Sequence, residues 1–277
     1  GDPDRWRPHL KTTKIPEMYA MLVEAGIRAF KCATVREVRV LLEVLEAKDI
    51  DDGDLLIAYP MQGPAIGVAS SLAGQFPRTA LAILSEDAEH ARSIPANLGV
   101  FVDVNPGMNR TGIEAAHSDK VAEVATAAAD RFRGIHFYDG HIHDETGPQR
   151  RASAHGNYDA LVALVDDLTE AGIAISEVIT SGTPAFRYAL DYPGFANGRL
   201  GGSDIKHRIS PGTVVFHDFQ YDELLEDVDL EPAAVVVARV VSHPREGIVT
   251  CDAGSKSIAA EAGNPVGFVI EIGRAHV

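Results

Sequence analysis

The chain passes from a strand to a helix through Arg7-Pro8-His9-Leu10-Lys11-Thr12-Thr13-Lys14, followed by Ile15-Pro16-Glu17 with proline in the first helical turn. In an α/β barrel, the loops that follow the strands line the mouth of the active site, so Lys11 would stand at the chemical end of a strand. A lysine that is desolvated there loses its proton near neutral pH and can form a Schiff base with a carbonyl group. The alternative is that Lys11 and Lys14 are solvated surface cations.

Strand-like and helix-like segments alternate along the next 200 or so residues. After the first strand, strand-like segments lie at residues 27–33, 54–59, 78–84, 98–104, 134–138 and 177–180 and within 206–216. Helix signals separate them, including Thr34 with Glu37 in a capping box and Ser85 as the cap of a later helix. Eight such units predict a (β/α)8 TIM-type barrel, with an open, doubly wound sheet as the alternative.

The pattern changes after the eighth strand. Residues 223–231 are acidic, and residues 233–242, 247–251 and 265–272 read as strands with no helices between them. We therefore predict a barrel over residues 1–222 and the start of a C-terminal β-strand domain over residues 223–277. Because these strands stop before a β domain could close, and the chain starts without methionine, we expect residues to be missing at both ends.

Composition excludes several classes of partner. The 277 residues are 45% hydrophobic, enough for a large core, and the net charge of −15 disfavours nucleic acid and anionic membranes. No apolar run approaches the roughly 20 residues of a membrane span. The two cysteines, Cys32 and Cys251, suggest no disulfide framework and fit a reducing, cytoplasmic location. Any phosphate must be held locally, by backbone amides and a few placed cations.

Two loops carry groups that could surround a ligand. The fifth strand ends in Asn105-Pro106-Gly107-Met108-Asn109-Arg110-Thr111-Gly112, a tight loop that would present Arg110 to the mouth, unless it is a turn with a solvated arginine. The sixth strand ends in Tyr138-Asp139-Gly140-His141-Ile142-His143-Asp144. Its His-x-His spacing suits a metal, but one imidazole could equally pack over a planar cofactor.

The seventh and eighth strands end in loops suited to an anion. Small and hydroxylic residues offer backbone N–H groups there, and the loops after these two strands form the usual phosphate site of phosphate-binding barrels. The residues are Ser181, Gly182 and Thr183 in the first loop and Ser210, Gly212 and Thr213 in the second. With Lys11 on the first strand, this describes a pyridoxal phosphate site, with Arg110, Tyr138 and His141 around the ring.

The sequence resembles the fold-type III pyridoxal phosphate enzymes, and within them the D-threonine aldolase and D-serine dehydratase group, from Arg7 to about Ala260. Residues 7–14 are similar to that group's Arg-Pro-His-x-Lys-Thr-His-Lys signature, which implies Lys11 as the cofactor lysine, with Thr13 in place of histidine. The other matches are Gly107-Met108-Asn109-Arg110-Thr111-Gly112, shared with alanine racemases, Tyr138 with Gly140-His141, Ser181-Gly182-Thr183, Ser210-Pro211-Gly212-Thr213, and Val215-Phe216-His217-Asp218-Phe219-Gln220-Tyr221. The resemblance implies that Arg110 reaches the cofactor's phenolic oxygen, and it adds Tyr221 to the cofactor-binding residues.

The chain departs from these relatives at two places. Alanine racemases place an arginine against the pyridine nitrogen where this chain has Ser210, which argues against racemase activity. The aldolases and dehydratases of the group carry a C-terminal metal pair, a histidine followed two residues later by cysteine or aspartate. Here His276 is followed only by Val277, so the metal ligands stay unknown, and manganese, zinc or magnesium would each be possible.

The leading hypothesis is a pyridoxal phosphate-dependent lyase that acts on D-3-hydroxy amino acids. Retro-aldol cleavage would release glycine and an aldehyde, and elimination would release ammonia and a 2-oxo acid, with a divalent cation gripping the β-hydroxyl in either reaction. The resemblance also implies a homodimer. The alternatives are an amino acid racemase, a non-catalytic pyridoxal phosphate carrier on the same barrel, and a metal-dependent hydrolase that uses His141 and His143.

Overall fold

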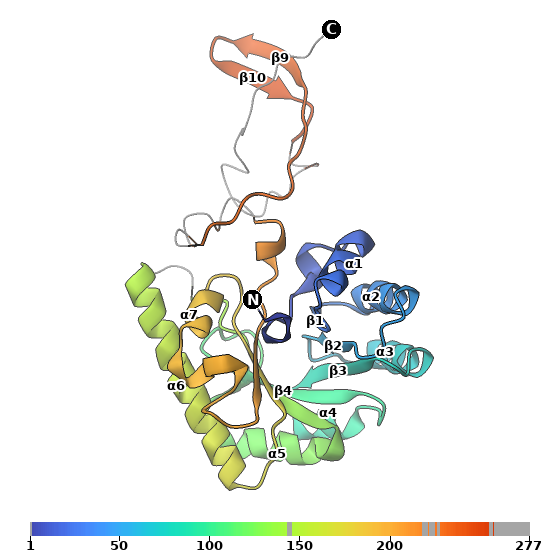
Figure 1. Ribbon diagram of the computed structural model, residues 1–277, viewed down its shortest axis with the longest axis vertical. Coiled ribbons are helices and arrows are strands. Elements are labelled where there is room, and N and C mark those ends of the chain that lie inside the picture. Colours follow the sequence, from blue (N-terminus) through green and yellow to red (C-terminus); the bar gives the residue numbers. More distant parts are fainter. Residues whose placement is uncertain are drawn as a thin grey trace. The chain divides into compact units, whose positions relative to one another are not determined.

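The computed structural model describes residues 2–142, 146–217, 221, 225, 228–254 and 257, and the chain divides into two units, residues 1–213 and 214–277. In the first unit, strands and helices alternate as predicted (Figure 1). Its strands are β1 Ala29–Cys32, β2 Asp54–Ile57, β3 Ala80–Ser85, β4 Gly99–Asn105, β5 Ile113–Glu114, β6 Phe132–Phe137, β7 Glu177–Thr180 and β8 Lys206–Ile209. Its α-helices are α1 Pro16–Glu24, α2 Val35–Ala47, α3 Pro64–Gln75, α4 Ala88–Ser93, α5 Ser118–Ala128, α6 Gly147–Glu170 and α7 Phe186–Leu190.

The strands form a closed parallel ring. The order is β1-β2-β3-β4-β6-β7-β8, and the short β5 pairs with β4 beside that path. Residues 6–9 fill the remaining position, because Trp6 pairs with Ile209 of β8 and His9 pairs with Lys31 of β1, both in parallel. Backbone hydrogen bonds from Arg7 N to Ile209 O (2.9 Å) and from Lys31 N to Pro8 O (2.9 Å) complete the closure. The predicted TIM-type barrel is therefore confirmed.

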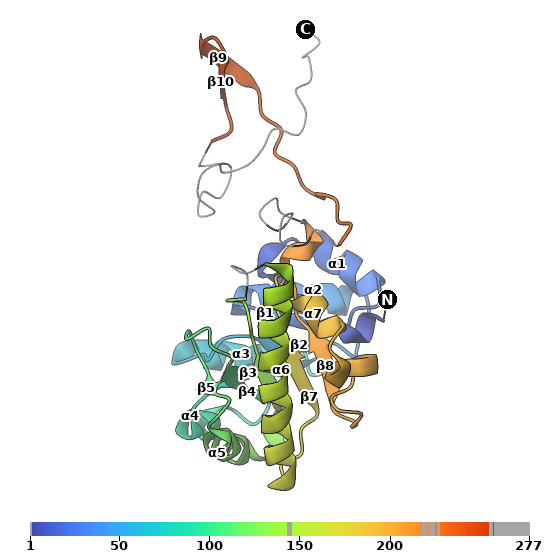
Figure 2. The same cartoon turned by 90° about the vertical axis from the view of Figure 1, so that its left-hand side faces the viewer.

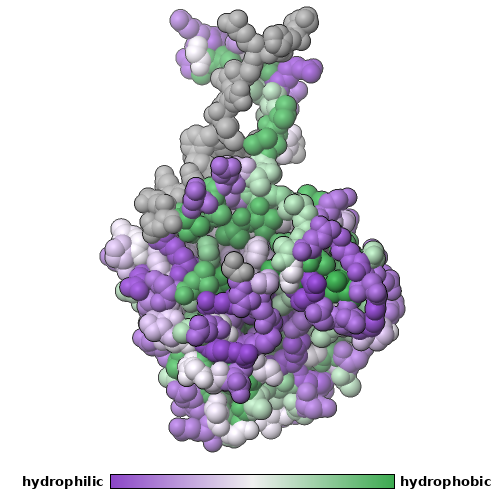
Figure 3. Space-filling model, in the orientation of Figure 1, coloured by the Kyte–Doolittle hydropathy of each residue, from purple (hydrophilic) through white to green (hydrophobic). Residues whose placement is uncertain are grey.

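The helices cover the outside of this ring because each has one apolar face. In α2 the buried apolar positions are Val38, Leu41, Leu42 and Leu45, and exposed positions include Arg36, Arg39, Glu43 and Glu46. The outer faces of the helices at the right of the barrel are accordingly mainly hydrophilic (Figure 3). The long α6 runs along one flank of the barrel (Figure 2).

One predicted cap is confirmed and one is wrong. Thr34 accepts a hydrogen bond from Glu37 N (3.2 Å), and the Glu37 carboxylate accepts one from Ala33 N (2.7 Å), so α2 begins with the expected reciprocal capping. The cap of α4 is Asp87, not Ser85: the Asp87 carboxylate accepts from His90 N at 2.7 Å. Ser85 is the last residue of β3, and the strand continues one residue further than the hydrophobic pattern indicated.

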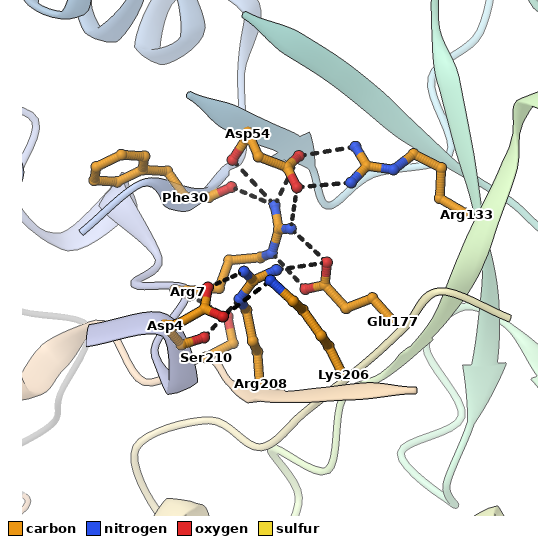
Figure 4. Close-up of polar contacts among 9 residues, drawn as sticks. All are labelled: Asp4, Arg7, Phe30, Asp54, Arg133, Glu177, Lys206, Arg208 and Ser210. Atoms are coloured by element: carbon orange, nitrogen blue, oxygen red, sulfur yellow. Dashed lines mark hydrogen bonds and ion pairs between the residues drawn. The ribbon is translucent and has the colours of Figure 1, made fainter. Parts of the chain in front are cut away.

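The interior of the ring has three levels. At the N-terminal ends of the strands lies a network of charged side chains: Asp4, Arg7, Asp54, Arg133, Glu177, Lys206 and Arg208 (Figure 4). Above it is a small apolar cluster made of Leu56, Ala82, Leu84, Phe101 and Ile179. Polar groups return at the C-terminal ends, where the predicted site lies. Because the middle level is apolar and packed, it separates the charged base from the mouth.

The second unit contains an antiparallel hairpin of β9 Val240–Arg245 and β10 Ile248–Cys251. The predicted strand at residues 233–242 is therefore shorter and begins later, and the predicted strand at residues 265–272 lies outside the described residues. The boundary that we placed between residues 222 and 223 stays a prediction. Among the described residues, no helix is both long enough and apolar enough to span a membrane.

Candidate functional site

Lys11 lies on a short turn at the C-terminal end of the first barrel strand. The chain leaves residues 6–9 and forms a 3-10 turn, Leu10–Thr12, which is anchored by the fully buried Leu10. The His9 ring caps this turn, because its Nδ1 accepts a hydrogen bond from Lys11 N (3.3 Å). Although the Lys11 side chain reaches solvent, packing around the amine lowers its pKa, and the charge of Arg110 lowers it further. These two effects favour a neutral amine.

The two predicted anion loops pack against each other and against the Lys11 turn. Ser210 N donates to Ser181 O (3.1 Å), and Thr213 N donates to the Thr183 hydroxyl (3.2 Å), so the ends of β7 and β8 are joined. Gly212 faces the first strand so closely that a Cβ there would lie 2.5 Å from His9 O. The structure therefore brings the second anion loop directly onto the turn that carries Lys11.

Ser181 and Ser210 each have a feature that is common in ligand-binding loops. Ser181 is fully buried and has φ of 53°, a left-handed conformation that is strained for a serine and is typical of functional loops. The Ser210 hydroxyl donates to Arg7 O (2.9 Å), and Ser210 is also buried. Because a hydroxyl has one hydrogen, Ser210 Oγ can only accept in any further hydrogen bond.

The Tyr138 ring lies in a slot between two glycines. A Cβ on Gly140 would come within 2.4 Å of the Tyr138 ring, and one on Gly182 within 2.8 Å, so glycine is required at both positions for the ring to sit there. The Arg110 guanidinium carbon lies 5.1 Å from the ring centroid, within cation–π distance. Burial raises the pKa of the Tyr138 hydroxyl, so it stays protonated. Tyr138 and Arg110 are thus brought together, as the sequence predicted.

His141 lies beside the loop of Arg110. A Cβ on Gly107 would be 3.4 Å from His141 Nε2, so the loops after β4 and β6 meet at this ring. His143 lies outside the described residues, so the predicted His-x-His metal spacing is not described. Tyr221 belongs to the second unit, and its role stays a prediction. Among the described residues, no group of three or more His, Cys, Asp or Glu side chains is suited to a metal ion.

Four buried polar side chains near the mouth were not assigned a role from the sequence. They are Lys31, Asp103, His136 and Asp139, and none is more than 3% exposed. Tyr158 donates to Asp139 Oδ2 (2.7 Å) and Gly182 N donates to Oδ1 (3.3 Å), while burial raises the pKa of this carboxyl to about 6. The sequence feature that could have identified such residues is a charged residue inside an apolar strand, as with Lys31 in the run of residues 27–33.

The residues at the mouth fit pyridoxal phosphate. The cofactor needs an amine, an anion-binding cup and a flat wall for its ring. Lys11 supplies the amine, and the Tyr138 ring supplies a wall beside Arg110. The joined loops of Ser181 and Gly212 suit the phosphate through those backbone N–H groups that do not already donate within the protein, as Gly182 N, Ser210 N and Thr213 N do.

The chain is similar to known proteins over most of its length. The family described as "Alanine racemase, N-terminal domain" matches residues 6–203, and "Putative serine dehydratase domain" matches residues 233–276. D-threonine aldolase of an Arthrobacter species is 27% identical over 279 aligned positions, which cover 95% of this chain and 67% of that protein. 3-Hydroxy-D-aspartate aldolase of Paracoccus denitrificans (strain Pd 1222) is 24% identical, over 86% of this chain and 58% of that protein.

A solved structure gives the same result for the fold. The crystal structure of D-threonine aldolase from Filomicrobium marinum superposes with a TM-score of 0.79 at 25% identity, covering 94% of this chain and 68% of that one. The chain thus spans about two thirds or less of the length of these relatives. The ring of strands, the matched residues and these similarities together lead to one conclusion: the chain belongs to the alanine racemase N-terminal domain family, and so to the fold-type III pyridoxal phosphate enzymes.

Proposed function

We propose that the protein is a pyridoxal phosphate-dependent lyase that acts on D-3-hydroxy amino acids. The observation that carries this proposal is the position of Lys11: its amine has a lowered pKa, and the turn that holds it packs against the Gly212 loop. The lowered pKa increases the share of neutral amine, the form that attacks an aldehyde, and a neighbouring set of backbone amides can hold that aldehyde's phosphate.

Each matched residue has a role in this proposal. Gly182 N, Ser210 N and Thr213 N already donate within the protein, so the remaining backbone N–H groups of residues 181–183 and 210–213 hold the phosphate. The Tyr138 ring supports one side of the cofactor while Arg110 binds its phenolic oxygen. Pyridoxal phosphate bound in this way stabilises negative charge at the Cα atom of an amino acid. Once the substrate's amine has displaced it from the cofactor, Lys11 Nζ would serve as the base, and its pKa is lowered by burial and by Arg110. In retro-aldol cleavage it would accept the proton of the β-hydroxyl; in elimination it would accept the Cα proton and pass it to the departing hydroxyl, which leaves as water.

Ser210 favours a lyase over a racemase. By resemblance, position 210 faces the pyridine nitrogen, where racemases use an arginine that cannot accept a proton. The Ser210 hydroxyl gives its hydrogen to Arg7 O (2.9 Å), so its oxygen is left to accept a hydrogen bond. An accepting oxygen favours a protonated ring nitrogen, which withdraws more charge from Cα. Stronger withdrawal stabilises negative charge at Cα and so suits cleavage of the Cα–Cβ bond or loss of the β-hydroxyl, whereas a racemase only removes and returns a proton at Cα.

The names of the relatives suggest which substrates to test. D-threonine and 3-hydroxy-D-aspartate are the substrates named for the two aldolase relatives, and D-serine is suggested by the dehydratase domain matched at residues 233–276. Retro-aldol cleavage and elimination both remain within the proposal. No step is assigned to a metal, because the ligands expected by resemblance do not lie among the described residues, but divalent cations belong in the assay. We also propose that the protein forms a homodimer, and the molar mass obtained by light scattering tests this.

The test uses the full 277-residue chain incubated with pyridoxal phosphate. The protein is expected to gain a visible absorbance band, and borohydride reduction followed by peptide mapping should place the cofactor on Lys11. The K11A variant should lose the band, and the matched K14A variant, three residues away on the exposed end of the turn, should keep it. D-threonine, 3-hydroxy-D-aspartate, D-serine and their L enantiomers are then supplied with and without manganese or zinc.

The products distinguish the alternatives. Glycine with an aldehyde indicates an aldolase, a 2-oxo acid with ammonia indicates a dehydratase, and inversion of configuration alone indicates a racemase. A protein that binds the cofactor on Lys11 but converts none of these substrates would be a carrier, and the proposed lyase would be wrong. Absence of any cofactor on Lys11 would remove the basis of the proposal altogether.

A further inference from the structure

A second lysine, Lys31, lies inside the barrel below the mouth. Lys31 is on β1 and is paired in register with His9, which precedes Lys11 by two residues. Along the strand direction, Lys31 therefore lies two residues further from the mouth than Lys11. Its exposed fraction is 1%, and among fully buried side chains of the described residues it is one of the largest. A fully buried lysine is rare unless it is paired, so its surroundings decide what it does.

Lys31 is the first member of a hydrogen-bonded series. Lys31 Nζ lies 3.4 Å from His136 Nε2, and His136 Nδ1 lies 2.7 Å from Asp103 Oδ1. Asp103 is a carboxylate whose pKa is held below its ordinary value, chiefly by its hydrogen bond to His136 against the opposing effect of burial. An ionised carboxylate accepts only, so His136 carries its hydrogen on Nδ1 and offers Nε2 as an acceptor to Lys31.

Within the part of the chain that the structure describes, the charge of a protonated Lys31 has no direct counter-ion. Among the described residues no carboxylate lies within ion-pair distance of Lys31 Nζ, and its polar partner is the neutral His136 ring. Burial, together with the charge of Lys11, lowers the pKa of the Lys31 amine to about 7. The titratable and charged groups around it are His9 and Lys11 from the first strand and its turn, Asp103 and Arg110 from the end of β4, and His136, Tyr138 and Asp139 from the end of β6.

Lys31 also touches the residue that faces the cofactor. Its Nζ lies 5.0 Å from the centroid of the Tyr138 ring, and the Arg110 guanidinium carbon lies 5.1 Å from the same centroid. The Tyr138 ring is held in its slot by Gly140 and Gly182, and Gly182 belongs to the first anion loop. A charge on Lys31 therefore changes the electrostatic potential at the position where an anionic ligand would bind.

We propose that Lys31 is a positioning residue and the internal counter-cation of this site: its amine takes up one proton from solvent when an anionic ligand binds at the mouth, and releases it when the ligand leaves. The His136–Asp103 pair fixes the direction of the Lys31 hydrogen bond in both states. This inference rests on the proposed function only in that pyridoxal phosphate is the anion used. The physical reason is that a nearby negative charge favours the charged form of a buried amine.

The test is calorimetric and does not depend on turnover. Pyridoxal phosphate is titrated into the cofactor-free protein at about pH 8 in buffers of different ionisation enthalpy, which gives the number of protons taken up per cofactor. An amine with a pKa near 7 is roughly one-tenth protonated at that pH. The number of protons taken up per bound cofactor should therefore be larger for wild type than for K31M, by about one half to one proton. K14M is the matched control, because Lys14 is an exposed lysine outside the barrel, and it should behave as wild type.

Nuclear magnetic resonance of the wild-type protein gives a second readout, which stands even if K31M does not fold. With lysine side chains labelled at Cε, one lysine should titrate near pH 7 in the cofactor-free protein, and its midpoint should move up by about one pH unit or more on binding. H136Q should alter this midpoint, because it replaces the ring that accepts from Lys31.

The outcomes separate the two proposals. If wild-type protein binds the cofactor, but K31M takes up as many protons and no buried lysine changes its titration, the inference about Lys31 is wrong and the proposed function stands. If wild-type protein does not bind pyridoxal phosphate at all, the proposed function and this inference are both overturned.

Discussion

Arg7 and Glu177 are joined by two hydrogen bonds inside the barrel, from Arg7 Nε to Glu177 Oε1 (2.9 Å) and from Arg7 Nη2 to Glu177 Oε2 (2.8 Å). Arg7 Nη2 also pairs with Asp54 Oδ2 (2.8 Å), and Arg7 is fully buried. The first residue of the Arg-Pro-His-x-Lys stretch thus fastens the N-terminal strand to the strands β2 and β7 (Figure 4). The lysine of the same stretch lies four residues later, at the opposite end of this strand.

Replacement of Arg7 is expected to destabilise the barrel strongly. R7M removes the cation between the buried Glu177 carboxylate and the partly buried Asp54 carboxylate, and breaking a buried ion pair costs about 3–5 kcal/mol of the free energy of unfolding. Urea denaturation of the cofactor-free protein measures this loss. R78M is the control, because Arg78 pairs with Asp49 at the surface and such pairs contribute up to about 1 kcal/mol. A loss for R7M no larger than that for R78M would show that the network does not hold the ring together.

The same network predicts how stability depends on acid. Burial alone would raise the pKa of Asp54, but the charges of Arg7 and Arg133 outweigh it and hold that pKa well below its ordinary value. A carboxyl whose pKa is lower in the folded state than in the unfolded state stabilises the fold above its unfolded pKa, about 4, and this contribution is lost as the pH falls further. The free energy of unfolding should therefore decrease from about pH 5 towards pH 2, by a term on the order of 2 kcal/mol from Asp54.

D54N separates this term from general acid effects. The variant should be less stable than wild type at about pH 7, and the difference between the two should shrink as the pH falls, because the unfolded wild-type chain then takes up a proton at Asp54 that the folded protein does not. A constant difference across the whole range would mean that Asp54 does not titrate with folding.

The barrel could be predicted from the sequence because its signals are local. Most of the buried strands are short apolar runs, and several helices begin at a recognisable cap or proline, as with Thr34 and Pro16. The grouping of Lys11 with the loops of Ser181 and Gly212 also followed, because the C-terminal ends of parallel strands meet at one end of a barrel.

The interior charges could not be predicted in this way. Arg7 lies 47 residues from Asp54 and 170 from Glu177, and nothing in the sequence around any of them specifies the pairing. Lys31 and His136 are 105 residues apart and meet only because both side chains point into a closed ring. Which face of a strand points inward is set by the register of the whole barrel, and a single strand does not reveal it.

Gly182 is expected to be required for the cofactor site and not for the fold. A Cβ at Gly182 would lie 2.8 Å from the Tyr138 ring, so G182A should push the ring out of its slot and weaken pyridoxal phosphate binding by about tenfold or more. Fluorescence or absorbance titration measures the affinity, and thermal denaturation of the cofactor-free protein monitors the fold.

A glycine with open space around it serves as the control for G182A. A Cβ at Gly156, in α6, would meet nothing within 4 Å, so G156A should keep the cofactor affinity and raise the free energy of unfolding by about 0.5–1 kcal/mol. Equal cofactor affinity in G182A and G156A would contradict the placement of Tyr138 at the site.

Arg110 is expected to set the pH at which Lys11 becomes reactive. Burial lowers the pKa of the Lys11 amine, and the Arg110 charge is the next contribution in the same direction. In R110M the pKa of Lys11 should therefore rise, because one repelling cation is gone. The rate at which the protein captures pyridoxal phosphate depends on the neutral amine, so the rate should increase with pH up to the pKa of Lys11, and the midpoint of that increase should move to higher pH in R110M.

The midpoint distinguishes this effect from a simple loss of binding. If Arg110 also contacts the cofactor, R110M lowers the capture rate at every pH, but a loss of contact alone leaves the midpoint where it is in wild type. R78M removes a positive charge at the exposed Arg78–Asp49 pair and should shift neither the rate nor the midpoint. A slower R110M with an unchanged midpoint would therefore show that Arg110 binds the cofactor without controlling the proton on Lys11.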